Sequence, residues 1–88
     1  MTRNVNRVGS MIGLSEKTKR EALDLMSIIK EKKYSAGKNP FCLAATMLYA
    51  ACGRTGEYIS QKEVAKAAGV TETTVRTRIK DLKAKKLI

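Results

Sequence analysis

The segment from Phe41 to Cys52 constrains the fold of this 88-residue chain more than any other, because nearly every residue in it is apolar and many are small. Asn39 is a good helix cap and Pro40 suits the first helical position, so the sequence predicts that a helix begins here. Such a helix has no solvent face and must be enclosed by neighbouring elements. It is also too short to cross a bilayer, and Thr46 interrupts it. We therefore expect a compact fold with this helix at its centre.

Helical start and stop signals recur along the rest of the chain, and no segment alternates apolar and polar residues as a strand does. A short helix is expected at about residues 4–12, a second from the Ser15 cap to Lys32, and a linker at 35–39. A loop is expected at 53–58. The inward side of the first helix is expected to comprise Val5, Val8, Met11 and Ile12. That of the second is expected to comprise Ala22, Leu25, Met26, Ile28 and Ile29. The predicted fold class is all-α, with residues 1–88 forming a single five-helix domain.

Residues 60–86 have the pattern of a helix-turn-helix. Ser60 and Glu63 form a capping box at the start of the fourth helix, and Gly69 supplies the positive φ that a short turn between helices needs. Thr71 is the expected N-cap of the fifth helix, and Glu72 lies in its first turn, where the helix dipole favours a negative charge. This pattern favours DNA as the partner.

The fifth helix is expected to have two different faces. Helical spacing places Val75, Ile79 and Leu82 on the inward side. The outward side is expected to carry Thr73, Arg76, Thr77 and Lys80. A basic face with hydroxyl groups suits the major groove, although the same charges could simply solvate a surface helix.

Charge and composition narrow the function further. Eighteen Lys and Arg against eight Asp and Glu give a net charge of +10, which favours a polyanionic partner. The chain has no histidine and only two cysteines, so we expect no zinc site, no cofactor and no catalytic activity. Cys42 and Cys52 would lie about 15 Å apart on one helix, beyond disulfide reach, and are expected to be buried thiols. The apolar segments predict neither a membrane span nor a secretion signal, so a soluble cytoplasmic protein is expected.

Three segments, in the same order, resemble the second cyclin-like repeat of archaeal transcription factor B, a relative of the eukaryotic general initiation factor IIB. They lie at residues 13–20 (GLSEKTKR), at 35–49, where SAGKNP leads to Leu43, Ala44, Ala45, Leu48 and Tyr49, and at 61–78. The resemblance extends from about Val8 to Leu82. It implies a compact five-helix cyclin-like box in which the last two helices form a helix-turn-helix.

In that family the helix-turn-helix enters the major groove upstream of the TATA box and reads a purine-rich element. The residues that reach base edges match Thr73 and Arg76, and Thr77 beside them is also expected to contact bases. Arg can donate two hydrogen bonds to guanine O6 and N7, and a Thr methyl can make an apolar contact with a thymine methyl. The expected phosphate contacts are Ser60, Gln61, Arg78 and Lys80. The family commonly has valine at position 73 and asparagine at 77, so the base preference is expected to be shifted or relaxed.

The resemblance also implies partners and a location. Promoter DNA and the TATA-binding protein are the expected partners, and the location is the archaeal cytoplasm in association with the nucleoid. The complete factor has a zinc ribbon, a reader and linker segment and a first cyclin repeat, so RNA polymerase is expected to be reached only through parts absent from this chain. No heptad or exposed apolar stripe suggests dimerisation, and we expect a monomer. The alternatives are a cyclin-like docking module for proteins and a stand-alone helix-turn-helix regulator.

Overall fold

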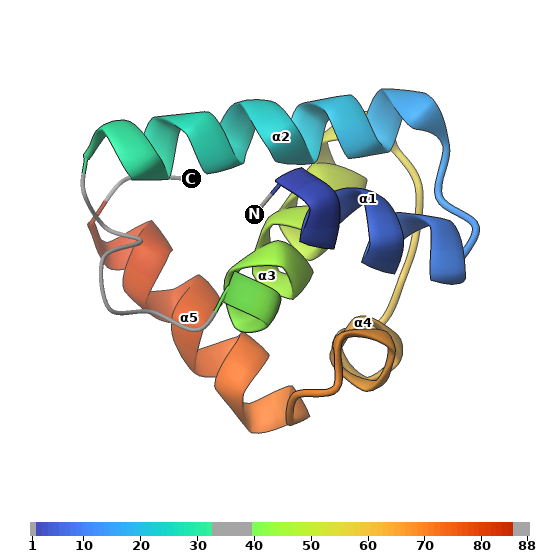
Figure 1. Ribbon diagram of the computed structural model, residues 1–88. Coiled ribbons are helices and arrows are strands. Elements are labelled where there is room, and N and C mark those ends of the chain that lie inside the picture. The colour runs from blue at the N-terminus through green and yellow to red at the C-terminus, as the bar shows by residue number, and fades with distance from the viewer. Residues whose placement is uncertain (1, 33–39, 86–88) are drawn as a thin grey trace.

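The computed structural model describes residues 2–32 and 40–85, and within these ranges the regular structure is helical (Figure 1). The helices, in chain order, are α1 (Thr2–Met11), α2 (Glu16–Glu31), α3 (Pro40–Thr55), α4 (Gln61–Ala68) and α5 (Glu72–Ala84). The predicted all-α class with five helices is confirmed. Two predictions lie outside the described residues. They are the linker at 35–39 with its Asn39 cap, and the end of the last helix at Lys86.

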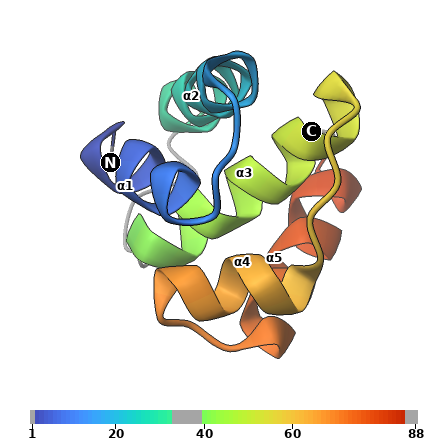
Figure 2. The same ribbon diagram turned by 90° about the vertical axis from the view of Figure 1, so that its right-hand side faces the viewer.

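Helix α3 is the centre of the molecule and packs against each of the other four described helices. Figure 2 shows α2 on one side of α3 and the α4–α5 pair on the other. Its buried residues are Cys42, Leu43, Ala44, Ala45, Thr46, Met47, Leu48, Ala51 and Cys52. Both cysteines are buried free thiols, as the sequence predicts. The small side chains let several helices approach one axis, which explains how a helix of this size can be enclosed by so short a chain.

One polar side chain inside α3 is accommodated without a cost to the core. Thr46 is fully buried, and its Oγ1 donates a hydrogen bond to the carbonyl of Cys42, 2.8 Å away, one turn earlier in the helix. A buried hydroxyl with such a partner avoids the penalty of an unsatisfied polar group. The interruption that Thr46 makes in the apolar sequence is therefore compatible with a central position.

The start of α2 is joined to the segment that leads into α4. Ser15 caps α2 by accepting from the Thr18 amide at 3.3 Å, and its own Oγ donates to Glu57 Oε1 at 2.6 Å. Thr18 is fully buried, and its hydroxyl also bonds to Glu57 and, at 2.7 Å, to the hydroxyl of Thr55. The hydrogen bonds from the Ser15 and Thr18 side chains hold the pKa of the Glu57 carboxyl below its usual value. This carboxylate thus fixes the chain just before the helix-turn-helix.

The end of α3 differs from the prediction of a loop at 53–58. The helix continues through Arg54 to Thr55, whose hydroxyl bonds to the Ala51 carbonyl at 3.1 Å, and the chain turns only at Gly56, where φ is +85°. The predicted boundary at Gly53 is wrong, because a glycine ends a helix where its backbone becomes left-handed. Gly53 is a helical residue, and the glycine with left-handed backbone is Gly56.

Two residues expected to face inward are exposed instead. Met11 has 62% of its surface exposed and Ile28 has 41%. Met11 is the last residue of α1, and the next residue, Ile12, packs against the core in its place. Ile28 precedes the buried Ile29, and one residue turns an α-helix by about 100°, which carries Ile28 off the buried stripe. Phe41, at the start of α3, is also 41% exposed, so the helix is not enclosed at its first two residues.

Candidate nucleic-acid interface

Gly69 and Thr71 define the turn between α4 and α5. Gly69 has φ +74° and ψ +27°, the left-handed conformation, and its amide donates to the Lys66 carbonyl at 3.2 Å. The Val70 amide donates to the Ala65 carbonyl at 3.0 Å, which closes the end of α4. Thr71 then caps α5, because its Oγ1 accepts from the Thr74 amide at 3.2 Å. The direction in which α5 leaves the turn is thus fixed by backbone bonds and one hydroxyl.

Helix α5 has an inner and an outer face. Val75, Ile79 and Leu82 are buried and belong to the same core as α3. The exposed residues along the outer face are Thr73, Arg76, Thr77 and Lys80. The inner face anchors the helix in the core, and the outer face carries hydroxyl and cationic groups. We call the surface formed by Thr73, Arg76, Thr77 and Lys80 the outer row.

Arg76 is exposed, but its guanidinium already has partners within the protein. Its Nη2 donates to Glu72 Oε1 at 3.0 Å, one turn earlier in α5, and its Nε donates to Gln61 Oε1 at 3.3 Å. The side chain keeps 49% of its surface exposed. Arg76 is therefore neither folded inward nor covered, and it is held in one place at the surface.

The residues predicted to contact phosphate have different environments. Lys80 is exposed, whereas Ser60, Gln61 and Arg78 are half-buried. Ser60 caps α4 by accepting from the Glu63 amide at 3.1 Å, and Gln61 lies against Arg76. The Nε atom of Arg78 is enclosed by the protein. Of these four residues only Lys80 is exposed, and the amide oxygen of Gln61 accepts a hydrogen bond from Arg76.

The structure adds Glu72 to the site. The sequence predicts for this residue only a favourable interaction with the dipole of α5, although its four-residue spacing from Arg76 is that of a helical ion pair. The contact with Gln61 had no signal in the sequence, because the two residues lie on different helices. Lys62 and Lys66 are further exposed cations, both on α4.

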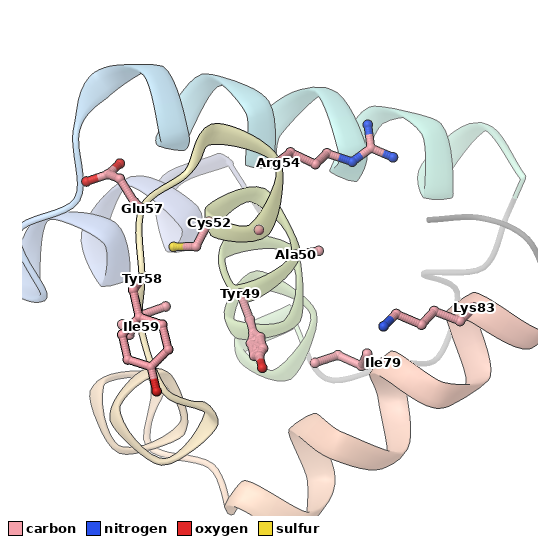
Figure 3. A pocket seen from close by; sticks show the side chains of 10 residues that line it. Tyr49, Ala50, Cys52, Arg54, Glu57, Tyr58, Ile59, Ile79 and Lys83 are labelled. Carbon is pink, nitrogen blue, oxygen red and sulfur yellow. The ribbon is translucent and has the colours of Figure 1, made fainter.

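A separate cavity of about 330 Å³ lies between the end of α3, the segment before α4 and α5 (Figure 3). Its walls include Tyr49, Cys52, Ile59 and Ile79, with the exposed Tyr58 beside it. Burial, together with the nearby Glu57 charge, raises the pKa of the Cys52 thiol to about 11. The thiol is thus protonated at neutral pH and poorly nucleophilic. The outer row does not contribute to this cavity.

Among the described residues, no three His, Cys, Asp or Glu side chains come together as a metal site. No helix in the described ranges has the length and apolar character needed to cross a membrane.

Comparison with known proteins identifies the family. The family model described as "Transcription factor TFIIB repeat" matches residues 1–85. The relatives include transcription initiation factor IIB of Sulfurisphaera tokodaii, 47% identical over 78 residues, which are 89% of this chain and 25% of that protein. Transcription initiation factor IIB of Pyrodictium occultum is 44% identical over 80 residues, covering 91% of this chain and 26% of that protein. Transcription initiation factor IIB 1 of Thermococcus kodakarensis is 42% identical over 78 residues, which are 89% of this chain and 26% of that protein.

This chain spans about a quarter of the length of these relatives. These relatives are transcription initiation factors, which are not enzymes. The TFIIB repeat is a cyclin-like all-α fold, in agreement with the helices described above. The chain belongs to the transcription factor TFIIB repeat family.

Proposed function

We propose that this chain binds double-stranded promoter DNA sequence-selectively, upstream of the TATA box, as the carboxy-terminal core repeat of an archaeal initiation factor B. The observation that carries the proposal is the outer row on α5, which is cationic and hydroxyl-bearing while the opposite face of the helix is buried in the core. Membership of the TFIIB repeat family supports a role in transcription initiation.

The side chains of the proposed interface divide into two kinds of contact. Thr73, Arg76 and Thr77 would reach base edges, with the Arg76 guanidinium directed at guanine. Phosphates would be contacted by the exposed Lys80 and by the half-buried Ser60, Gln61 and Arg78. These contacts would set the register of the protein on the duplex. Because the net charge is +10, the affinity should fall steeply with salt.

The family also supports the TATA-binding protein as a second partner, which would raise the affinity of a small domain that binds DNA weakly when alone. Recruitment of RNA polymerase is proposed for other parts of the complete factor. We propose that the chain acts as a monomer within such a complex.

A docking module for proteins is the second candidate, since the cavity beside Tyr58 offers an apolar hollow with an exposed aromatic residue at its edge. Figure 3 shows Ile79 and Lys83 reaching from α5 toward α3 on one side of this hollow. The cavity and the outer row involve different residues, so one experiment can distinguish the two functions.

That experiment is an NMR titration of the chain with a short duplex carrying the purine-rich upstream element and, separately, with a scrambled duplex at the same salt concentration. DNA reading predicts amide shifts confined to residues 60–83 and larger for the matched duplex. Equal shifts with both duplexes would contradict sequence selectivity. A spectrum that neither duplex changes would favour the docking module.

A further inference from the structure

We propose that Glu72 and Gln61 act as a buttress that fixes the direction of the Arg76 guanidinium, and that both are therefore specificity-determining residues. This inference rests on the proposed DNA-binding function and deepens it. Its basis is the pair of hydrogen bonds from Arg76 to acceptors on two different helices, at 3.0 Å to Glu72 and 3.3 Å to Gln61.

The chemistry of the guanidinium determines which of its donors remain available. The group is planar and carries five N–H donors in a fixed fork. Its Nε–H and one N–H of Nη2 form one edge of the plane, and these are the two nitrogens that Gln61 and Glu72 engage. The other edge, made by Nη1 and the second N–H of Nη2, presents two parallel donors. That edge has the geometry needed for guanine O6 and N7.

Holding the guanidinium in advance changes the cost of reading a base. A free arginine side chain loses much rotamer freedom when it makes two hydrogen bonds to one base, and pre-organisation removes part of that loss. It also narrows the set of bases that the fork can reach, because the plane can no longer tilt freely. Gln61 is the first residue of α4, so the direction of Arg76 depends on how α4 sits against α5.

Glu72 should affect affinity and selectivity in opposite directions. Its carboxylate lies in the first turn of α5, 43% exposed, and would repel nearby phosphates of any duplex. Its hydrogen bond to Arg76, in contrast, would favour one base pair. A residue that served only as a helix-dipole partner would not influence base preference at all.

The test measures affinity by fluorescence anisotropy at fixed salt for a panel of duplexes, each with one base pair of the upstream element changed. Glu72→Ala is expected to reduce the preference at the base pair that Arg76→Ala affects by about threefold to tenfold, while the affinity for a scrambled duplex stays equal or rises. Glu72→Gln should keep most of the preference, because its amide oxygen still accepts from Arg76. Gln61→Ala should lower the preference at the same base pair.

Glu63→Gln is the matched control, since it removes an exposed first-turn charge from α4 and glutamine can still serve in a capping box. It should raise the affinity for all duplexes and leave the preference unchanged. A second readout uses the protein without DNA: the heteronuclear NOE of the Arg76 Nε–H should be high in the wild-type chain and lower in Glu72→Ala.

The outcomes separate the buttress from the proposed function. If the wild-type chain shows no preference, or Arg76→Ala keeps it, the proposed function fails and the buttress with it. If Arg76→Ala loses the preference while Glu72→Ala keeps it, only the buttress is overturned. If Glu72→Ala and Glu72→Gln lose the base preference equally, Glu72 acts through its charge and not through its hydrogen bond to Arg76, which also overturns the buttress. A changed preference at a different base pair would make Glu72 a direct reader, which also overturns the buttress.

Discussion

Arg76 is the residue on which the proposed base reading depends, and its surroundings suit that task. About half of the side chain is exposed, at 49%, and the rest lies against α5 and the start of α4. Its ion pair with Glu72 is exposed on both sides and so adds little to the stability of the fold. Replacing Arg76 should therefore affect DNA recognition far more than folding.

We expect Arg76→Ala to weaken binding to a guanine-containing matched duplex by about 1 to 3 kcal/mol and to flatten the preference over a scrambled duplex. The reason is the loss of two hydrogen bonds from the guanidinium to one guanine. Competition binding at a single salt concentration measures both quantities. An unchanged ratio between the two duplexes would contradict the assignment of Arg76.

Lys80→Ala is expected to behave differently, because an exposed lysine on the outer row would contact phosphate and not a base. Binding should weaken about equally for all duplexes, and the slope of log affinity against log salt should decrease in magnitude by about one. A salt titration with matched and scrambled duplexes checks this. A loss restricted to the matched duplex would show that Lys80 reads sequence.

The stability of the fold is expected to depend on pH through Glu57. Its pKa is lowered in the folded chain by the Ser15 and Thr18 hydrogen bonds, so folding favours the charged form. The resulting stabilisation is fully present above the pKa of an unfolded glutamate and is lost as the pH falls through the lowered folded value. We expect Glu57→Gln to unfold at lower urea concentration than the wild type at pH 7 and to differ from it less at pH 3. Asp24→Asn, at an exposed site of α2, should show a smaller difference at pH 7.

At the scale of elements, the turn at Gly69 decides where the outer row points. Gly69 has φ +74°, and nothing lies within 4 Å of the Cβ that a substitution would add, so the penalty of Gly69→Ala comes from the backbone alone. We expect Gly69→Ala to destabilise the chain by about 1–2 kcal/mol and to weaken DNA binding. Chemical denaturation and duplex titration measure the two effects.

Gly53→Ala is the control for that prediction. Gly53 is helical in α3, and a Cβ there would also meet nothing within 4 Å. Alanine is the better helix former, so this variant should be more stable than the wild type by roughly 0.5–1 kcal/mol. If both variants changed stability in the same direction, the left-handed backbone of Gly69 would not be the cause.

At the scale of the whole molecule, stability depends on the enclosure of α3. Leu48 is fully buried, and α3 packs against the other four described helices, so Leu48→Ala should cost about 2–5 kcal/mol. Ile28→Ala, which removes a 41% exposed side chain from α2, should cost about 1 kcal/mol or less. Urea unfolding followed by circular dichroism measures both. Similar losses for the two variants would argue against a single core centred on α3.

The helices and their caps could be predicted from local sequence. Ser15, Ser60 and Thr71 accept hydrogen bonds at the starts of α2, α4 and α5, and the buried faces of these helices follow the apolar spacing. The misplaced boundary at Gly53 and the exposed side chains of Met11 and Ile28 show the limit of such reasoning. A residue at the edge of an apolar stripe is buried or exposed according to which neighbouring helix passes over it, and the spacing alone does not contain that information.

The sequence by itself determined the helical class, the central position of α3 and the division of α5 into an apolar and a cationic face, because each follows from the order of side chains along one helix. Only the tertiary structure decided that Gln61 reaches the guanidinium of Arg76, and that Glu57 bonds to Ser15 and Thr18 at the start of α2. These contacts join residues as much as 42 positions apart, and their formation depends on how whole helices pack. Hydrogen bonds act over about 3 Å, so a small change in packing makes or breaks them without any change in the local pattern.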